Sequence, residues 1–185
     1  MARQLDYVLI VDVESTCWDG QVPQGQISEI IEIGLCTVNV RSLQRGDKRS
    51  ILVRPARSDV GAFCTRLTTL TPSQVAGGMP LSDALSILQH DYRSRERLFA
   101  SWGDYDRNQF QRNCRDYGLE YPFGPTHLNI KNLFSVVFGL PKELGIPEAC
   151  EKMGIPLEGT LHRGVDDAWN IAQLFCGLLK RTRGE

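Results

Sequence analysis

Residues 7–14, YVLIVDVE, are the stretch that decides the fold of this chain. The run from Tyr7 to Val11 is continuously apolar and rich in branched residues, which predicts a central strand buried on both faces. Side chains alternate along a strand, so Asp12 and Glu14 leave the same face and could share one cation. The alternative is a strand that ends in solvent at Asp12, with Glu14 opening a polar loop.

A second acidic stretch, SWGDYD at residues 101–106, offers two candidate carboxylates. Residues 97–101 predict another buried strand, and a helix is expected from Arg107 to Tyr117. A single stripe of that helix carries Asp106, Phe110, Cys114 and Tyr117. Asp104 lies before the first turn, so Asp106 is the predicted site residue. The alternative is that Asp106 is an ordinary helix N-cap.

The third acidic stretch is HRGVDD, residues 162–167. Asp167 shares a helical stripe with Ile171, Leu174, Phe175 and Leu178, which predicts that it faces the core. Asp166 lines up with Asn170, Gln173 and Gly177, so it is expected to face water. His162 lies on a flexible approach to the helix and could take a proton from water. The other histidines, His90 and His127, belong to no comparable acidic cluster.

Carboxylates gathered on buried elements repel one another unless divalent cations neutralise them. The three acidic stretches therefore predict a two-metal hydrolytic site. Carboxylate and phosphate oxygens are the ligands that Mg²⁺ or Mn²⁺ prefers.

The rest of the sequence predicts an α/β fold with a mixed sheet. Residues 31–40 and 48–54 alternate like antiparallel strands joined by a turn at Gly46-Asp47, and the strands near Leu98 and Leu128 should be parallel. Helices are expected at residues 81–92, 107–117, 132–138, 147–153 and 165–179. Residues 71–74, TPSQ, form a capping box with Pro at the first helical position.

Length and composition indicate one catalytic domain covering residues 1–185. The chain is long enough for a single core, and no Pro/Ser-rich linker or repeat divides it. The N-terminus begins like that of a cytosolic protein, and the apolar run before Asp12 is too short for a signal peptide or membrane span. Six cysteines without a C-x-x-C motif are expected to be reduced.

The net charge of −1 includes the four carboxylates assigned to metals. Without them the remaining surface is about +3, which favours capture of a few terminal nucleotides over long contact with duplexes. The expected phosphate contacts are Arg107, Arg112, Arg115 and Arg163; the alternative is a solvated helix face. A second basic cluster, Arg41, Arg45, Lys48 and Arg49, is expected around the Gly46 turn.

Five segments in order resemble the DEDDh 3′→5′ exonucleases, and among them the Eri-type branch that trims RNA 3′ ends. These are DVESTC (12–17), EIIEIG (29–34), FCTRLTTLTPSQVAGG (63–78), SWGDYDRNQF (101–110) and HRGVDDAWNIA (162–172). Proofreading subunits and oligoribonucleases share the acids, but FCTRLTTLT (63–71) and SWGDYD (101–106) look Eri-like. The branch often has Trp where Tyr105 stands, so base stacking there should be weaker.

The resemblance implies a ribonuclease-H-like, mixed five-stranded sheet flanked by helices. It also implies that Asp12, Glu14, Asp106 and Asp167 bind two Mg²⁺ or Mn²⁺ ions and that His162 is the general base. Leu67 and Thr68 would support the terminal base and sugar, although Leu67 could equally be core. Further substrate contacts are expected from Tyr105, Phe63, Arg107 and Arg163.

The expected activity is hydrolysis of single-stranded RNA from its 3′ end, releasing 5′-mononucleotides. One alternative is a DNA-directed proofreading or repair exonuclease. The other is a non-catalytic nucleic-acid-binding module on the same fold.

Overall fold

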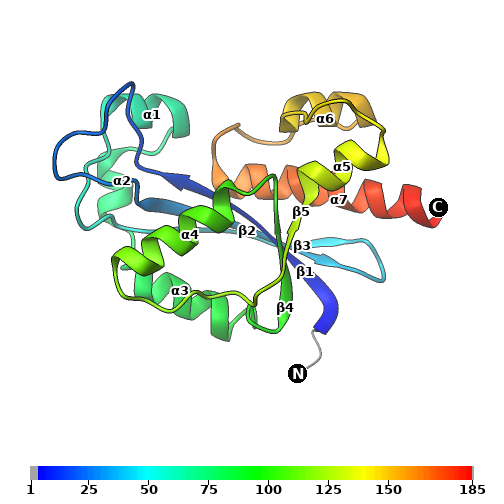
Figure 1. Ribbon diagram of the computed structural model, residues 1–185, viewed down its shortest axis with the longest axis horizontal. Helices are drawn as coiled ribbons and strands as arrows, with labels where there is room; N and C mark the ends of the chain where they lie inside the picture. The colour runs from blue at the N-terminus through cyan, green and yellow to red at the C-terminus, as the bar shows by residue number, and fades with distance from the viewer. Residues whose placement is uncertain (1–3, 185) are drawn as a thin grey trace.

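The computed structural model describes residues 4–184 and is built on a five-stranded sheet in the order β3-β2-β1-β4-β5 (Figure 1). The strands are β1 (Gln4–Ser15), β2 (Ile30–Asn39), β3 (Arg45–Leu52), β4 (Arg97–Ser101) and β5 (His127–Asn129). β1, β2 and β3 are antiparallel, whereas β4 is parallel to β1 and β5 is parallel to β4. The predicted mixed sheet is confirmed. Residues 1–3, part of the N-terminus expected to be cytosolic, lie outside the described residues.

The helices are α1 (Ala62–Thr68), α2 (Pro72–Ala76), α3 (Leu81–His90), α4 (Tyr105–Asp116), α5 (Ile130–Val137), α6 (Ile146–Met153) and α7 (Gly164–Arg183). α5, α6 and α7 cover one face of the sheet, and α3 and α4 cover the other (Figure 1). α1 was not predicted, because it is short and its N-cap, Gly61, makes no side-chain capping bond. The capping box at Thr71 and Gln74 is confirmed.

β1 is buried on both faces, as its apolar run predicted. Val8 and Ile10 pack in the cluster beneath α5, α6 and α7, whereas Leu9 and Val11 pack with α3 and α4. Asp12 and Glu14 continue the Val8–Ile10 alternation, so β1 presents them towards α7.

The turn between β2 and β3 was predicted at the wrong place. It lies at residues 40–44, and Gly46 is already paired with Thr37 inside the β2–β3 ladder. The Asn39 side chain accepts hydrogen bonds from the backbone N–H groups of Arg41 and Ser42, at 3.0 and 2.9 Å, and so turns the chain before Gly46 is reached. The basic cluster therefore lies partly on the edge strand β3 rather than around a turn at Gly46.

Candidate active site

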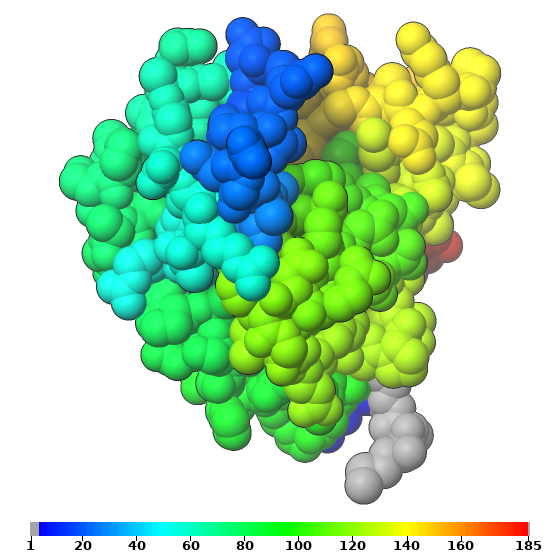
Figure 2. All heavy atoms as spheres, turned by 60° about the vertical axis from the view of Figure 1, so that its left-hand side comes forward, coloured from blue at the N-terminus to red at the C-terminus, as the bar shows by residue number. Residues whose placement is uncertain are grey.

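Five predicted residues, Asp12, Glu14, Asp106, His162 and Asp167, line one cavity of about 410 Å³, here called the acidic cavity. It lies where β1 and β4 end, between the segment after β1 and the start of α6 (Figure 2). Open α/β sheets place their ligands at such carboxyl ends of strands. The rest of its lining comprises Val13, Ser15, Cys17, Leu67, Trp102, Tyr105, Gly145, Ile146, Pro147 and Leu161.

Asp12 and Glu14 enter the acidic cavity from β1. Asp12 is half-buried and Glu14 is buried, and no hydrogen-bond donor within residues 4–184 reaches either carboxylate. Burial, followed by repulsion from Asp106 and Glu14, raises the pKa of Asp12 well above its usual range. Burial and the Asp167 charge raise the pKa of Glu14 to about 8. Both groups therefore resist ionisation until a cation compensates their charge.

Asp106 joins them from the first turn of α4. Its Oδ1 accepts a hydrogen bond from the Val13 backbone N–H at 2.9 Å, which ties α4 to β1. Burial raises the pKa of Asp106 to about 6, although hydrogen bonds to its carboxylate, that of Val13 foremost, oppose the shift. Asp104, not Asp106, occupies the N-cap position, so the interpretation of Asp106 as an N-cap is wrong.

The two candidate carboxylates in residues 101–106 thus have different surroundings. Asp104 does not line the acidic cavity; its carboxylate lies 3.3 Å from the Arg107 guanidinium and accepts from the Asn129 amide at 3.1 Å. Behind Asp106, the buried Ser101 hydroxyl lies 2.8 Å from Nε2 of His127. Burial lowers the pKa of His127 to about 4, so this imidazole is neutral at physiological pH.

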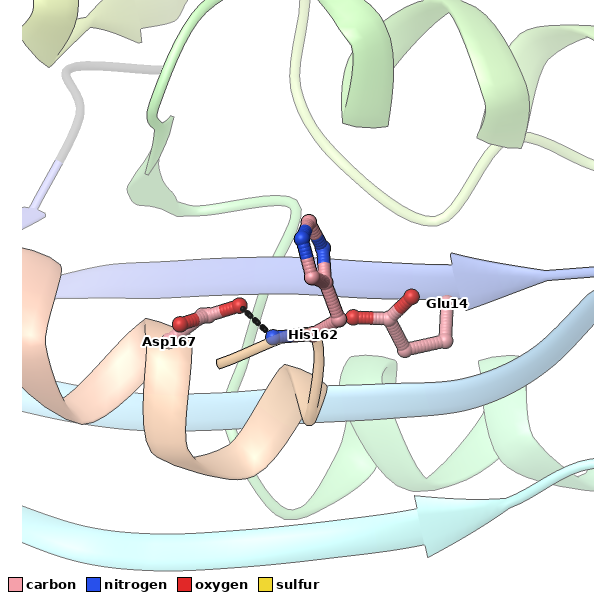
Figure 3. Close-up of side chains that lie close together, drawn as sticks. All are labelled: Glu14, His162 and Asp167. Carbon is pink, nitrogen blue, oxygen red and sulfur yellow. Dashed lines mark hydrogen bonds between the residues drawn. The ribbon is translucent and has the colours of Figure 1, made fainter. Parts of the chain in front are cut away.

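Asp167 and His162 complete the acidic cavity from the start of α7 (Figure 3). The His162 backbone N–H donates to Asp167 Oδ2 at 2.8 Å, while Asp167 Oδ1 is buried with no partner among the described residues. Burial raises the pKa of Asp167 to about 6. The ring of His162 is exposed, and its backbone has a φ of 59°, in the left-handed region.

Asp166 was expected to face water, and this is wrong. It is half-buried, lies 2.6 Å from Lys48 Nζ and accepts from the Thr160 backbone N–H at 2.9 Å. Burial opposes ionisation, but these two partners outweigh it and lower the pKa of Asp166. Asn170, on the same stripe, is also buried, because residues 158–160 and β3 cover this side of α7.

The remaining residues predicted to contact substrate divide into those that line the acidic cavity and those that do not. Leu67 of α1 and Tyr105 of α4 line the acidic cavity and are 37% and 53% exposed. Thr68 is buried and donates to the Cys64 carbonyl at 2.9 Å, and Phe63 lies beside Arg66 outside the cavity lining.

Two of the four arginines expected to contact phosphate are paired with carboxylates. Arg107 lies against Asp104, and Arg163 is paired with Glu32. The sequence pattern indicates no role for Glu32 or for Trp102, which lines the acidic cavity. The only signal for Glu32 was an acid inside an otherwise apolar strand.

The donors of the acidic cavity fit a divalent cation. One ligand atom from each of Glu14, His162 and Asp167 lies within 4.8 Å of the others. The unpartnered oxygen of Asp167 and the mutual repulsion of the carboxylates are both relieved by a bound cation. Asp12 and Asp106 line the same cavity and can complete a ligand set of carboxylate oxygens.

Comparison with known proteins identifies the family to which this chain belongs. Residues 9–175 match the model of the exonuclease family, RNase_T. The chain belongs to the exonuclease family. It is 29% identical over 185 residues to the rat 3'-5' exoribonuclease 1, covering 95% of this chain and 53% of the relative. It is 26% identical over 196 residues to the 3'-5' exonuclease Snipper of Drosophila melanogaster, covering 94% of this chain and 69% of the relative.

A solved structure is also similar along the whole chain. The nuclease domain of 3'hExo, described as a DEDDh family member bound to rAMP, has a TM-score of 0.85 and 27% identity, covering 97% of this chain and 95% of that one. The predicted DEDDh resemblance and ribonuclease-H-like fold are confirmed, as is the assignment to the exonucleases. The chain spans about half the length of the rat exoribonuclease. None of the helices described is long and apolar enough to cross a membrane.

Proposed function

We propose that residues 1–185 form one catalytic domain that trims single-stranded RNA from the 3′ end and releases 5′-mononucleotides. The observation that carries this proposal is the meeting of Asp12, Glu14, Asp106, His162 and Asp167 in one cavity. The names of the rat relative, an exoribonuclease, and of the structural neighbour bound to rAMP support RNA as the substrate.

The four carboxylates would hold two divalent cations, Mg²⁺ or Mn²⁺. Bound there, the cations would supply charge neutralisation at the phosphate and a lowered pKa of a water molecule. His162 would accept a proton from the attacking water at a ring nitrogen, because its imidazole is exposed at the cavity and close to Glu14 and Asp167.

The end of the strand would be held between two elements. Leu67 on α1 and Tyr105 on α4 both line the acidic cavity with partly exposed side chains, so they can contact the terminal base without reading its sequence. Thr68 acts indirectly in this arrangement, by fixing the last turn of α1. Phe63 and Arg107 lie outside the cavity lining and would contact only nucleotides further from the end.

A cytoplasmic location is part of the same proposal. The six cysteines are free in the structure, five of them buried, as expected of a protein from a reducing compartment. RNA would be the main nucleic-acid partner in that compartment.

The test uses single-stranded oligomers that differ only at the 3′ end, with ribose or deoxyribose and with a 3′-hydroxyl or 3′-phosphate. With Mg²⁺, we expect 5′-mononucleotides from the 3′-hydroxyl RNA and resistance of the 3′-phosphorylated strand, because the terminal sugar must fit within the cavity. The preference for ribose should be modest. Equal digestion of the capped strand would contradict an end-capturing exonuclease.

Two other outcomes support the alternatives. A clear preference for deoxyribose would favour a DNA-directed exonuclease. Binding without cleavage at any Mg²⁺ or Mn²⁺ concentration would favour a non-catalytic module.

A further inference from the structure

Glu32, the third residue of β2, is fully buried and is held by donors from two other segments. Its carboxylate accepts from Nε and Nη2 of Arg163, both at 3.2 Å, and from the Gly164 backbone N–H at 3.0 Å. The Ser50 hydroxyl of β3 donates to the same carboxylate. Three of the four bonds thus fix the two residues that follow His162.

The start of α7 has no room to move against the sheet at this point. A Cβ atom on Gly34 would lie 1.8 Å from the Gly164 carbonyl carbon, and one on Gly164 would lie 2.8 Å from the Asp12 carbonyl oxygen. Gly164 is therefore in direct contact with both β1 and β2. Glu32 fixes the helix terminus at the position where this contact forms.

His162 itself has little other support. Its ring is exposed, its φ of 59° is unfavourable for a residue with a Cβ atom, and the segment before it turns through Gly159, whose φ is 77°. The hydrogen bond from its backbone N–H to Asp167 holds one side. On the N-terminal side the Thr160 backbone N–H donates to Asp166, and the residue directly after His162, Arg163, is paired with Glu32.

We propose that Glu32 and Arg163 are positioning residues that set the place of the His162 imidazole over the acidic cavity. This inference rests on the proposed function, since it assigns His162 the role of proton acceptor. The bidentate pair holds the Arg163 side chain against β2. Because His162 is bonded directly to Arg163, this fixed position helps to keep the His162 backbone in the left-handed conformation. Arg163 then has its Nε and Nη2 edge committed to Glu32, which leaves positioning rather than phosphate binding as its main role.

The experiment compares Glu32→Gln and Arg163→Lys in the wild-type and His162→Ala backgrounds. In the wild-type background each variant should lower kcat on 3′-hydroxyl RNA by about 10–100-fold, as the loss of a supporting hydrogen-bond partner typically does, with KM changed less than about threefold. In the His162→Ala background the same substitutions should cost less than about threefold, because the group that they position is gone.

Glu29→Gln is the matched control. Glu29 is also buried on the β2 side of the fold and accepts three hydrogen bonds, from the Ala56 and Arg57 backbone and the Tyr117 hydroxyl, but it does not line the acidic cavity. The Glu29→Gln variant should lower stability, and any effect that it has on kcat should not depend on whether His162 is present.

Amide hydrogen exchange of the metal-free protein gives a second measurement that is independent of activity. Glu32→Gln and Arg163→Lys should accelerate exchange of the His162 amide by on the order of tenfold, and Glu29→Gln should leave it unchanged. If Glu32→Gln does not fold, Arg163→Lys decides the question alone, since it keeps the charge and loses only the paired geometry.

Three results would overturn the inference: an equal loss of kcat in both backgrounds, a raised KM at constant kcat in Arg163→Lys, or unaltered exchange at His162. None of these touches the proposed function. That function would fail separately, if the wild-type protein did not cleave 3′-hydroxyl RNA or if His162→Ala remained fully active.

Discussion

Two pairs of buried carboxylates in this molecule have opposite surroundings. Glu29, which directly precedes β2, and Glu32, which lies within it, each accept at least three hydrogen bonds. Glu14 and Asp167, in the acidic cavity, together accept only one among the described residues, from the His162 backbone. All four side chains are less than 10% exposed.

The difference separates structural carboxylates from those available for ligands. A buried charge is tolerated when donors surround it, and Glu29 and Glu32 meet that condition within the protein itself. In the part of the chain that the structure describes, Glu14 accepts no such bond and Asp167 accepts only one, from His162, so burial raises their pKa values to about 8 and about 6. The acidic cavity is thus a region where the fold gives up stability for binding capacity.

The largest effect is expected at Asp12. Asp12→Asn should reduce cleavage on the order of a thousandfold or more, because it removes a charged ligand from the cation site. In the metal-free protein its melting temperature should hold or rise, since one repelling charge is gone. Steady-state kinetics with Mg²⁺ and thermal melting in EDTA measure the two effects. Near wild-type cleavage would refute the assignment of Asp12 to the cation site.

Asp106 is intermediate between the two kinds of buried carboxylate, because it lines the acidic cavity but accepts a hydrogen bond from the Val13 backbone. Asp106→Asn keeps an oxygen for that bond and loses only the charge, so activity should fall about a hundredfold with little change in stability. Asp104→Asn, two residues away and outside the acidic cavity, is the control and should have far less effect. Equal losses in the two variants would mean that the helical stripe did not identify the ligand.

The last effect is on stability as a function of pH, and it is spread over several carboxylates. Folding raises the pKa of Glu14 from 4.5 to about 8, and those of Asp106 and Asp167 from 3.8 to about 6. The folded metal-free protein therefore binds more protons than the unfolded chain between pH 4 and 8, and its stability falls as the pH rises through this window.

Melting at pH 5 and pH 8 in EDTA should show this loss, on the order of a few kcal/mol. Saturating Mg²⁺ should reduce it, because the cation favours the ionised carboxylates. Glu29→Gln should retain the slope, whereas Glu14→Gln should diminish it. A slope of the opposite sign in EDTA would contradict the raised pKa values.

The positions of the site acids could be predicted because they depend on local periodicity. The strand alternation at Asp12 and Glu14 and the helical stripes of Asp106 and Asp167 are properties of short windows. The structure places all four side chains on the expected inward faces. The parallel strands followed from the helices that separate them along the chain.

The features that were missed depend on partners distant in sequence. Asp166 is withdrawn from water by Lys48, more than a hundred residues away, and Glu32 gains its role only from Arg163. The β2–β3 turn lies before the predicted position, because the Asn39 side chain accepts hydrogen bonds from backbone N–H groups that precede Gly46. Short windows contain none of this information.

The site residues are widely separated along the chain, so the acidic cavity cannot be complete until synthesis of the protein is nearly finished. Asp12, Glu14 and Asp106 emerge first, but His162, Asp167 and the helix that packs on β1, β2 and β3 come later. A nascent chain that stops before residue 162 has the carboxylates of β1 and α4 and lacks the other wall of the acidic cavity. We expect such a chain to be inert towards the message being translated, and the nuclease to become competent only when α7 docks.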